Sequence, residues 1–224
     1  MTRISRMLDL SQELYPNSPG LPDVPPPSVE LLRNGPRDGW NLEVLTTPLH
    51  WGTHLDAPAH LADFSRTMDA YTVEELQGPA VVCDLRGRPP RTPITVADLE
   101  PADPPPHSVV LLVTGWGAYL GWNRRWVLES PFLDPHAAAW LAGRGIRGIG
   151  IDHLSIGGLG PENRATHQAL LGAEIWIAEN LHYPDALLDG GPWHVIALPV
   201  RIRAASGGPA RVVALRWAQD AERA

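Results

Sequence analysis

The segment His50-Trp51-Gly52-Thr53-His54-Leu55-Asp56-Ala57-Pro58-Ala59-His60 places three histidines and one aspartate within eleven residues. The four side chains stand at even offsets, so an extended backbone would direct all of them to one face. A helix would bring His50 and His54 together but turn Asp56 about 200° away from His54. Gly52 and Pro58 also disfavour a helix. A straight strand of this length would span about 33 Å, so the segment must curl if it forms a single site.

This set of side chains suits a metal ion. Imidazole and carboxylate together are ligands for Zn²⁺, Mn²⁺ or Fe²⁺. A carboxylate among histidines can also bridge two ions about 3.5–4 Å apart, as in two-metal hydrolases. The alternative is that some of these residues are ordinary loop histidines, with Thr53 or Asp56 capping a helix. Four ligand-type residues at this density favour the metal.

The string His-x-Gly-Thr-His-x-Asp-x-Pro-x-His resembles the signature of the cyclase family of metal-dependent hydrolases, which includes bacterial kynurenine formamidases and isatin hydrolases. Three later features resemble the same family, so the resemblance covers nearly the whole chain. They are Gly150-Ile151-Asp152 followed by Ser155, the twelve-residue separation of His167 from Glu179, and Ser206-Gly207-Gly208-Pro209-Ala210-Arg211.

The resemblance implies a ligand set for two ions. It implies that His50, His54 and Asp56 hold the first ion, and that Asp56, His167 and Glu179 hold the second. It leaves His60 free as the general acid and base, the role that the resembling formamidases give to the corresponding histidine. The expected cofactor is Zn²⁺, two per chain, or Mn²⁺, since both accept these ligands.

The spacing of His167 and Glu179 sets a condition on the fold. In one continuous helix these residues would lie about 18 Å apart along the axis, too far to share a site. We therefore expect a helix over residues 164–171, a turn at Gly172 and a strand over 174–181 that returns Glu179 to His167.

Strand-type segments outnumber helical ones along the chain. Further strands are expected over residues 4–10, 29–32, 41–45, 80–85, 108–114, 146–152, 193–203 and 210–217, and further helices after Thr72 and after Asp134. The prediction is a single α/β domain over residues 1–224, a β-rich mixed sheet with flanking helices. The resemblance implies a swivelling β/β/α-type fold. It also implies that the proline-rich arm near residues 16–27 walls the active site, where this chain has Tyr15 and Leu21 and no tryptophan.

Composition excludes several classes of partner. The net charge of -7 without a basic run argues against nucleic acid. No stretch approaches 18 apolar residues, which argues against a membrane span, and we expect a cytoplasmic protein. The lone Cys83 cannot form an internal disulfide.

The sequence lacks a Gly-x-Ser-x-Gly elbow, a phosphate loop and a Cys-x-x-Cys pair. A metal-activated water is therefore the expected nucleophile. The resemblance implies hydrolysis of a non-peptide C–N bond in an aryl formamide or a small cyclic amide, and nine tryptophans are compatible with an aromatic substrate. Two alternatives stay open: a cyclase, lactonase or dehydratase using the same metals, and a non-catalytic metal-binding protein. The resemblance also implies a homodimer whose exchanged arms complete the pocket.

Overall fold

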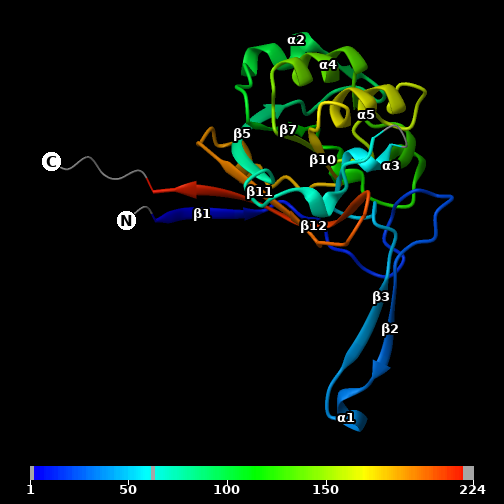
Figure 1. Ribbon diagram of the computed structural model, residues 1–224. Coiled ribbons are helices and arrows are strands. Elements are labelled where there is room, and N and C mark those ends of the chain that lie inside the picture. The colour runs from blue at the N-terminus through cyan, green and yellow to red at the C-terminus, as the bar shows by residue number, and fades with distance from the viewer. Residues whose placement is uncertain (1–2, 62–63, 219–224) are drawn as a thin grey trace.

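The computed structural model describes residues 3–61 and 64–218, and an eight-stranded mixed sheet forms its centre (Figure 1). The strands lie in the order β1 (Ile4–Asp9), β12 (Gly207–Trp217), β11 (His194–Pro199), β5 (Gln77–Asp84), β7 (Val109–Val113), β9 (Gly148–Ile151), β10 (Trp176–Glu179) and β4 (His54–Asp56). β12 also pairs with β4, so the sheet closes into a ring with β1 outside it. Closure removes the sheet edge at β4, the strand that carries the histidine motif.

The parallel half of the ring supports the helices. β5, β7, β9 and β10 run parallel to one another, and every residue of β7 is buried, as its continuous apolar run predicts. The helices α2 (Val96–Leu99), α4 (Pro135–Gly143) and α5 (Asn163–Leu171) lie together on one side of these strands (Figure 1). α4 begins as expected, because the Asp134 side chain accepts the N–H of His136 and Pro135 stands at the first helical position.

Alternation along the strands produces two apolar cores. Leu55, Leu111 and Val195 fill the inside of the ring, whereas Val110 and Leu112 face outward onto the helices. Successive side chains of a strand point to opposite faces, so neighbouring residues of β7 supply both cores.

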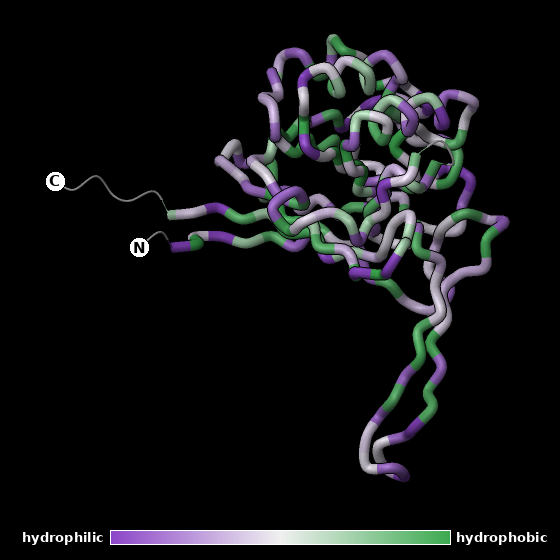
Figure 2. The backbone as a smooth tube through the Cα atoms, in the orientation of Figure 1, coloured by the Kyte–Doolittle hydropathy of each residue, from purple (hydrophilic) through white to green (hydrophobic). Residues whose placement is uncertain are grey.

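A hairpin of β2 (Ser28–Arg33) and β3 (Leu42–Thr46), with the short helix α1 (Gly35–Asp38) at its tip, extends away from the body (Figure 1). Every residue of both strands is exposed, although much of the hairpin is hydrophobic (Figure 2). Besides short 3₁₀ turns, the described elements include α3 (Arg124–Leu128) and the parallel pair β6 (Pro93–Ile94) and β8 (Phe132–Leu133).

The α/β class and the mixed, strand-rich sheet are as predicted. The short helix expected after Thr72 is wrong: a turn covers residues 73–76, and β5 begins at Gln77. Thr72 and Glu75 have the spacing of a capping box, and Glu75 accepts the N–H of Thr72 at 2.8 Å. Gly78 and Pro79 belong to β5 and pair with β11, which leaves too few residues for a helix.

In the described part of the chain no helix combines the length and apolarity that a membrane span requires.

Candidate metal centre

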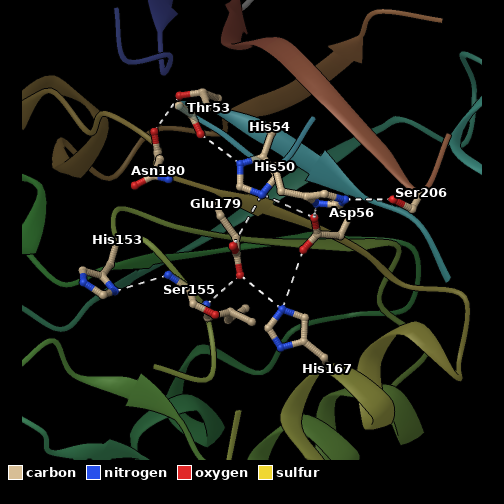
Figure 3. Close-up of polar contacts among 12 residues, drawn as sticks. His50, Thr53, His54, Asp56, His153, Ser155, His167, Glu179, Asn180 and Ser206 are labelled. Atoms are coloured by element: carbon tan, nitrogen blue, oxygen red, sulfur yellow. Dashed lines mark hydrogen bonds and ion pairs between the residues drawn. The ribbon is translucent and has the colours of Figure 1, made fainter. Parts of the chain in front are cut away.

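Three elements carry the predicted ligands into one place. His54 and Asp56 stand two residues apart on β4, so their side chains share a face. Glu179 lies directly opposite His54 in the antiparallel pairing of β10 with β4. His167 comes from α5, and Gly172 caps the helix as expected. Figure 3 shows the four side chains converging between the strands and the helix.

The four ligand-type groups are buried and evenly spaced. The Nε2 atom of His54 lies 3.4 Å from Oδ1 of Asp56 and 3.5 Å from Oε2 of Glu179. The Nε2 atom of His167 lies 3.3 Å from Oε1 of Glu179 and 3.7 Å from Oδ2 of Asp56. Ligands of a tetrahedral ion with bonds of about 2.0–2.1 Å stand about 3.3 Å apart. The donor set therefore fits a divalent cation.

The other two histidines of the motif lie beside this group. His50 contacts Asp56 through Nδ1 at 2.6 Å and Ser206 through Nε2 at 2.9 Å. The ring of His60, which ends a 3₁₀ turn over Pro58–His60, lies 3.9 Å from the ring of His50, centroid to centroid. The segment curls as predicted, with Gly52 at a φ of 58°.

All six predicted site residues thus meet at one centre. Ligand atoms within 4.8 Å of one another form two groups that share Asp56, one with His50 and His60 and the other with His54 and Glu179. The resemblance implied a different division, with His54 beside His50 on the first ion. The assignment of each ligand to an ion stays a prediction.

Without a cation, the carboxylates of the centre are compensated by protons on the histidines. Burial raises the pKa of Asp56, but its contacts with His167, His50 and His54 outweigh burial and hold that pKa well below its usual range. Burial lowers the pKa of His54 and of His167, yet Asp56 and Glu179 raise them to about 9 and about 10. Among the described residues, Oδ2 of Asp56 is nevertheless buried without a hydrogen-bond partner. An orphaned carboxylate oxygen facing imidazole nitrogens fits a bound metal ion better than a purely structural role.

His60 differs from the other histidines. It is the exposed member of the group, and burial of its ring, partly opposed by Asp56, lowers its pKa. A neutral imidazole at the mouth of the site can accept a proton.

A cavity of about 290 Å³ opens onto the centre. Four leucines from three segments wall it, and polar side chains line the rest; Leu21, Leu61, Leu154, Leu159, Ser155, Asn163 and Arg164 surround the histidines and Glu179. Leu21 shows that the proline-rich arm does reach the site. Among the described residues that line the cavity there is no phenylalanine, tyrosine or tryptophan.

The segment over residues 152–156 contacts Glu179 through its backbone. His153 is fully buried, and its Nε2 donates to the carbonyl of Trp126. Burial lowers the pKa of His153 to about 4. The N–H of Ile156 donates to Oε1 of Glu179 at 2.8 Å. The segment thus orients the carboxylate by a backbone bond.

Comparison with known proteins identifies the family of this chain. The family model described as "Putative cyclase" matches residues 8–157. The chain belongs to the cyclase family. Among its curated relatives are the kynurenine formamidases of Bordetella pertussis, 31% identical with 94% of this chain and 98% of the relative covered, and of Geobacillus thermodenitrificans, 32% identical with 91% and 94% covered.

Solved structures of cyclase-family proteins share the fold. Isatin hydrolase A from Ralstonia solanacearum superposes with a TM-score of 0.83 at 27% identity, covering 94% of this chain and 91% of that one. A predicted metal-dependent hydrolase from Bacillus stearothermophilus gives a TM-score of 0.77 at 28% identity, covering 94% and 98%. The resemblance found in the sequence is confirmed.

Proposed function

We propose that this cyclase-family chain is a metal-dependent hydrolase of a non-peptide C–N bond. The substrate is an aryl formamide such as N-formylkynurenine, or a small cyclic amide such as isatin. The observation that carries the proposal is the buried group of His54, Asp56, His167 and Glu179 beneath a cavity, with the exposed His60 beside it. Relatives named kynurenine formamidase and a fold neighbour named isatin hydrolase support the choice of substrates.

His50, His54 and Asp56 would hold the first ion. Asp56, His167 and Glu179 would hold the second. The metal is Zn²⁺ or Mn²⁺. Bound ions would supply positive charge beside the scissile carbonyl and lower the pKa of a water toward about 7.

The protein's own groups do the rest of the chemistry. His60 takes the proton from the attacking water and delivers it to the leaving nitrogen, a task for a group that is neutral at pH 7. Ser206 contacts Nε2 of His50 at 2.9 Å and orients the ring, so that Nδ1, which faces Asp56, is the nitrogen that would bind the ion. The leucine walls, Leu154 and Leu159 among them, bind the apolar part of the substrate and exclude water.

We also propose that the active form is a homodimer. The β2–β3 hairpin presents a run of exposed apolar side chains: Val29, Leu31, Leu32, Trp40, Leu42, Val44 and Leu45. An extended apolar surface of this kind on a protruding arm favours a protein partner. A second copy of this chain supplies a matching surface. A cytoplasmic location remains a prediction.

Metal content per chain is the first test. Protein purified without chelator is measured by elemental analysis as wild type, Glu179→Ala and the exposed control Glu100→Ala. We expect nearly two ions in wild type and in the control, and fewer in Glu179→Ala. One ion that is unaffected by Glu179→Ala would confine the site to residues 50–60. No metal in wild type would favour a protein that kept the fold without the chemistry.

A substrate panel then separates the reaction classes. Aryl formamides and cyclic imides are compared with lactones at equal concentration. Turnover of formamides or imides supports the proposal, whereas turnover of lactones alone would favour the cyclase or lactonase alternative. A metal-loaded protein that turns over no activated amide or ester would revive the non-catalytic alternative.

A further inference from the structure

The peptide that follows Glu179 is held in an unusual conformation. Asn180 has a φ of 54°, in the left-handed region that side-chain-bearing residues rarely adopt. Its N–H donates to the carbonyl of His153 at 2.8 Å, and its carbonyl accepts the hydroxyl of Thr53 at 2.6 Å (Figure 3). Asn180 is buried, so these two bonds satisfy both polar groups of a peptide that has left the strand ladder.

The Thr53 hydroxyl connects three segments. Besides donating to Asn180, it accepts the N–H of Gln12 at 2.8 Å, and the carbonyl of Thr53 accepts the N–H of Ala210 at 2.9 Å. Thr53 is buried, with 5% of its surface exposed. A side chain that both donates and accepts inside the protein has little freedom to rotate.

Thr53 and Asn180 stand at the point where the strand ladder stops. β4 and β10 share three residue pairs, and the last pairs His54 with Glu179. Beyond that pair, Asn180 turns away in its left-handed conformation. The hydrogen bond from the Thr53 hydroxyl to Asn180 therefore joins the residue before His54 to the residue after Glu179.

We propose that Thr53 is a positioning residue whose hydroxyl fixes His54 and Glu179 at the separation a metal ion requires. This inference rests on the proposed metal centre. Thr53 contacts neither substrate nor metal in it and acts through the Asn180 peptide. Side chains that orient ligands in this way typically change metal affinity or activity by 10–100-fold when replaced.

The test compares two substitutions that differ in the hydroxyl. Thr53→Val keeps the shape of the side chain and removes the hydroxyl, whereas Thr53→Ser keeps the hydroxyl. Zn²⁺ and Mn²⁺ are titrated separately into metal-free protein by calorimetry. We expect Thr53→Val to lose about ten- to a hundredfold in metal affinity and Thr53→Ser to stay within about twofold of wild type.

A control separates positioning from general destabilisation. Ser108→Ala removes another buried hydroxyl, which donates to the carbonyl of Pro105 at 2.7 Å, remote from the site. We expect Ser108→Ala to lower Tm about as much as Thr53→Val while its metal affinity stays at the wild-type value.

A second pair of variants covers the case in which Thr53→Val does not fold. Asn180→Gly and Asn180→Ala both delete the side chain, but only glycine adopts a positive φ freely. We expect Asn180→Ala to bind metal more weakly than Asn180→Gly, and equal affinities in this pair would overturn the proposal.

The remaining outcomes distinguish this inference from the proposed function. Wild-type affinity in Thr53→Val, or an equal loss in Thr53→Ser and Thr53→Val, would overturn the role of the hydroxyl and leave the metal centre standing. A wild type that binds neither ion would overturn the metal centre itself, and the inference with it.

Discussion

Residues 50–60, which supply four side chains to the candidate metal centre, and residues 28–46, which form the β2–β3 hairpin, are neighbouring stretches of the chain. The two regions differ in which kind of side chain is placed unfavourably. At the centre, polar groups are buried, and one carboxylate oxygen of Asp56 lacks a partner. On the hairpin, apolar side chains such as Leu31 and Val44 are exposed. Burying a charge without compensation is costly, and leaving a large apolar surface in water is also unfavourable. A bound cation would stabilise the buried carboxylates of the centre, and a protein surface would cover the apolar side chains of the hairpin.

Asp56→Asn changes the residue that both candidate ligand groups share, and we expect it to have the largest effect. The neutral amide removes the charge that the histidines face. We expect loss of bound metal and a fall in turnover of about 10³-fold or more, since an ion contributes several kcal/mol to catalysis. Metal analysis and kcat/KM measurements check this, with the exposed Asp23→Asn as control. Full metal occupancy in Asp56→Asn would place the ion elsewhere.

His60→Ala sharpens the contrast within the centre. His60 is exposed, while His54 is buried among the carboxylates. We expect His60→Ala to retain metal and lose about 10²–10⁴-fold in kcat, the usual contribution of a general acid and base. His54→Ala, measured alongside, should lose metal. Equal metal loss from the two variants would refute the separate role of His60.

The sequence predicts the centre well because its chemistry is local. Residues 50–60 show four ligand-type side chains without any knowledge of the fold. The link from His167 to Glu179 needed the family resemblance, and the structure explains it by the stop at Gly172 and the β10–β4 pairing. Most strands were also predictable, because apolar runs such as β7 are continuous.

Other parts of the site depend on contacts between residues far apart in the chain. Ser206 reaches His50 across 156 positions, and Leu159 reaches the cavity from a loop. The family resemblance includes Ser206 but does not indicate its contact with His50, and no local pattern marks Leu159. The wrong helix after Thr72 has a similar cause, since pairing of Gly78 and Pro79 with β11 overrides a local capping signal.

Charged residues introduced on the β2–β3 hairpin test whether its exposed apolar surface forms the dimer contact. In the β2–β3 register Leu31 faces Glu43, and Val44 faces Glu30. The double substitution Leu31→Lys with Val44→Lys therefore creates favourable cross-strand pairs and preserves the hairpin, while it removes apolar surface. We expect dimer to become monomer, with a dissociation constant raised at least about 30-fold, corresponding to about 2 kcal/mol.

Sedimentation equilibrium measures this change against a chain mass of 24.4 kDa. Val73→Lys serves as control, because Val73 is 59% exposed and lies outside the hairpin. A wild type that is monomeric at all accessible concentrations would show that the exposed hairpin has another partner or none.

The smallest expected effect concerns His153, a buried polar side chain whose hydrogen bond goes to another part of the same chain. Burial lowers its pKa from 6.5 to about 4 in the folded protein. Between these values the unfolded chain binds the proton more readily, so this group's stabilising contribution is present above pH 6.5 and is lost as pH falls toward 4. From pH 7 to pH 5 the loss is about 2 kcal/mol. Urea unfolding of metal-free protein at both pH values should show that the free energy of unfolding falls more in wild type than in His153→Gln. Equal decreases in the free energy of unfolding would mean that His153 is not a buried neutral imidazole. The contrast with Asp56, whose Oδ2 has no hydrogen-bond partner among the described residues, would then fail.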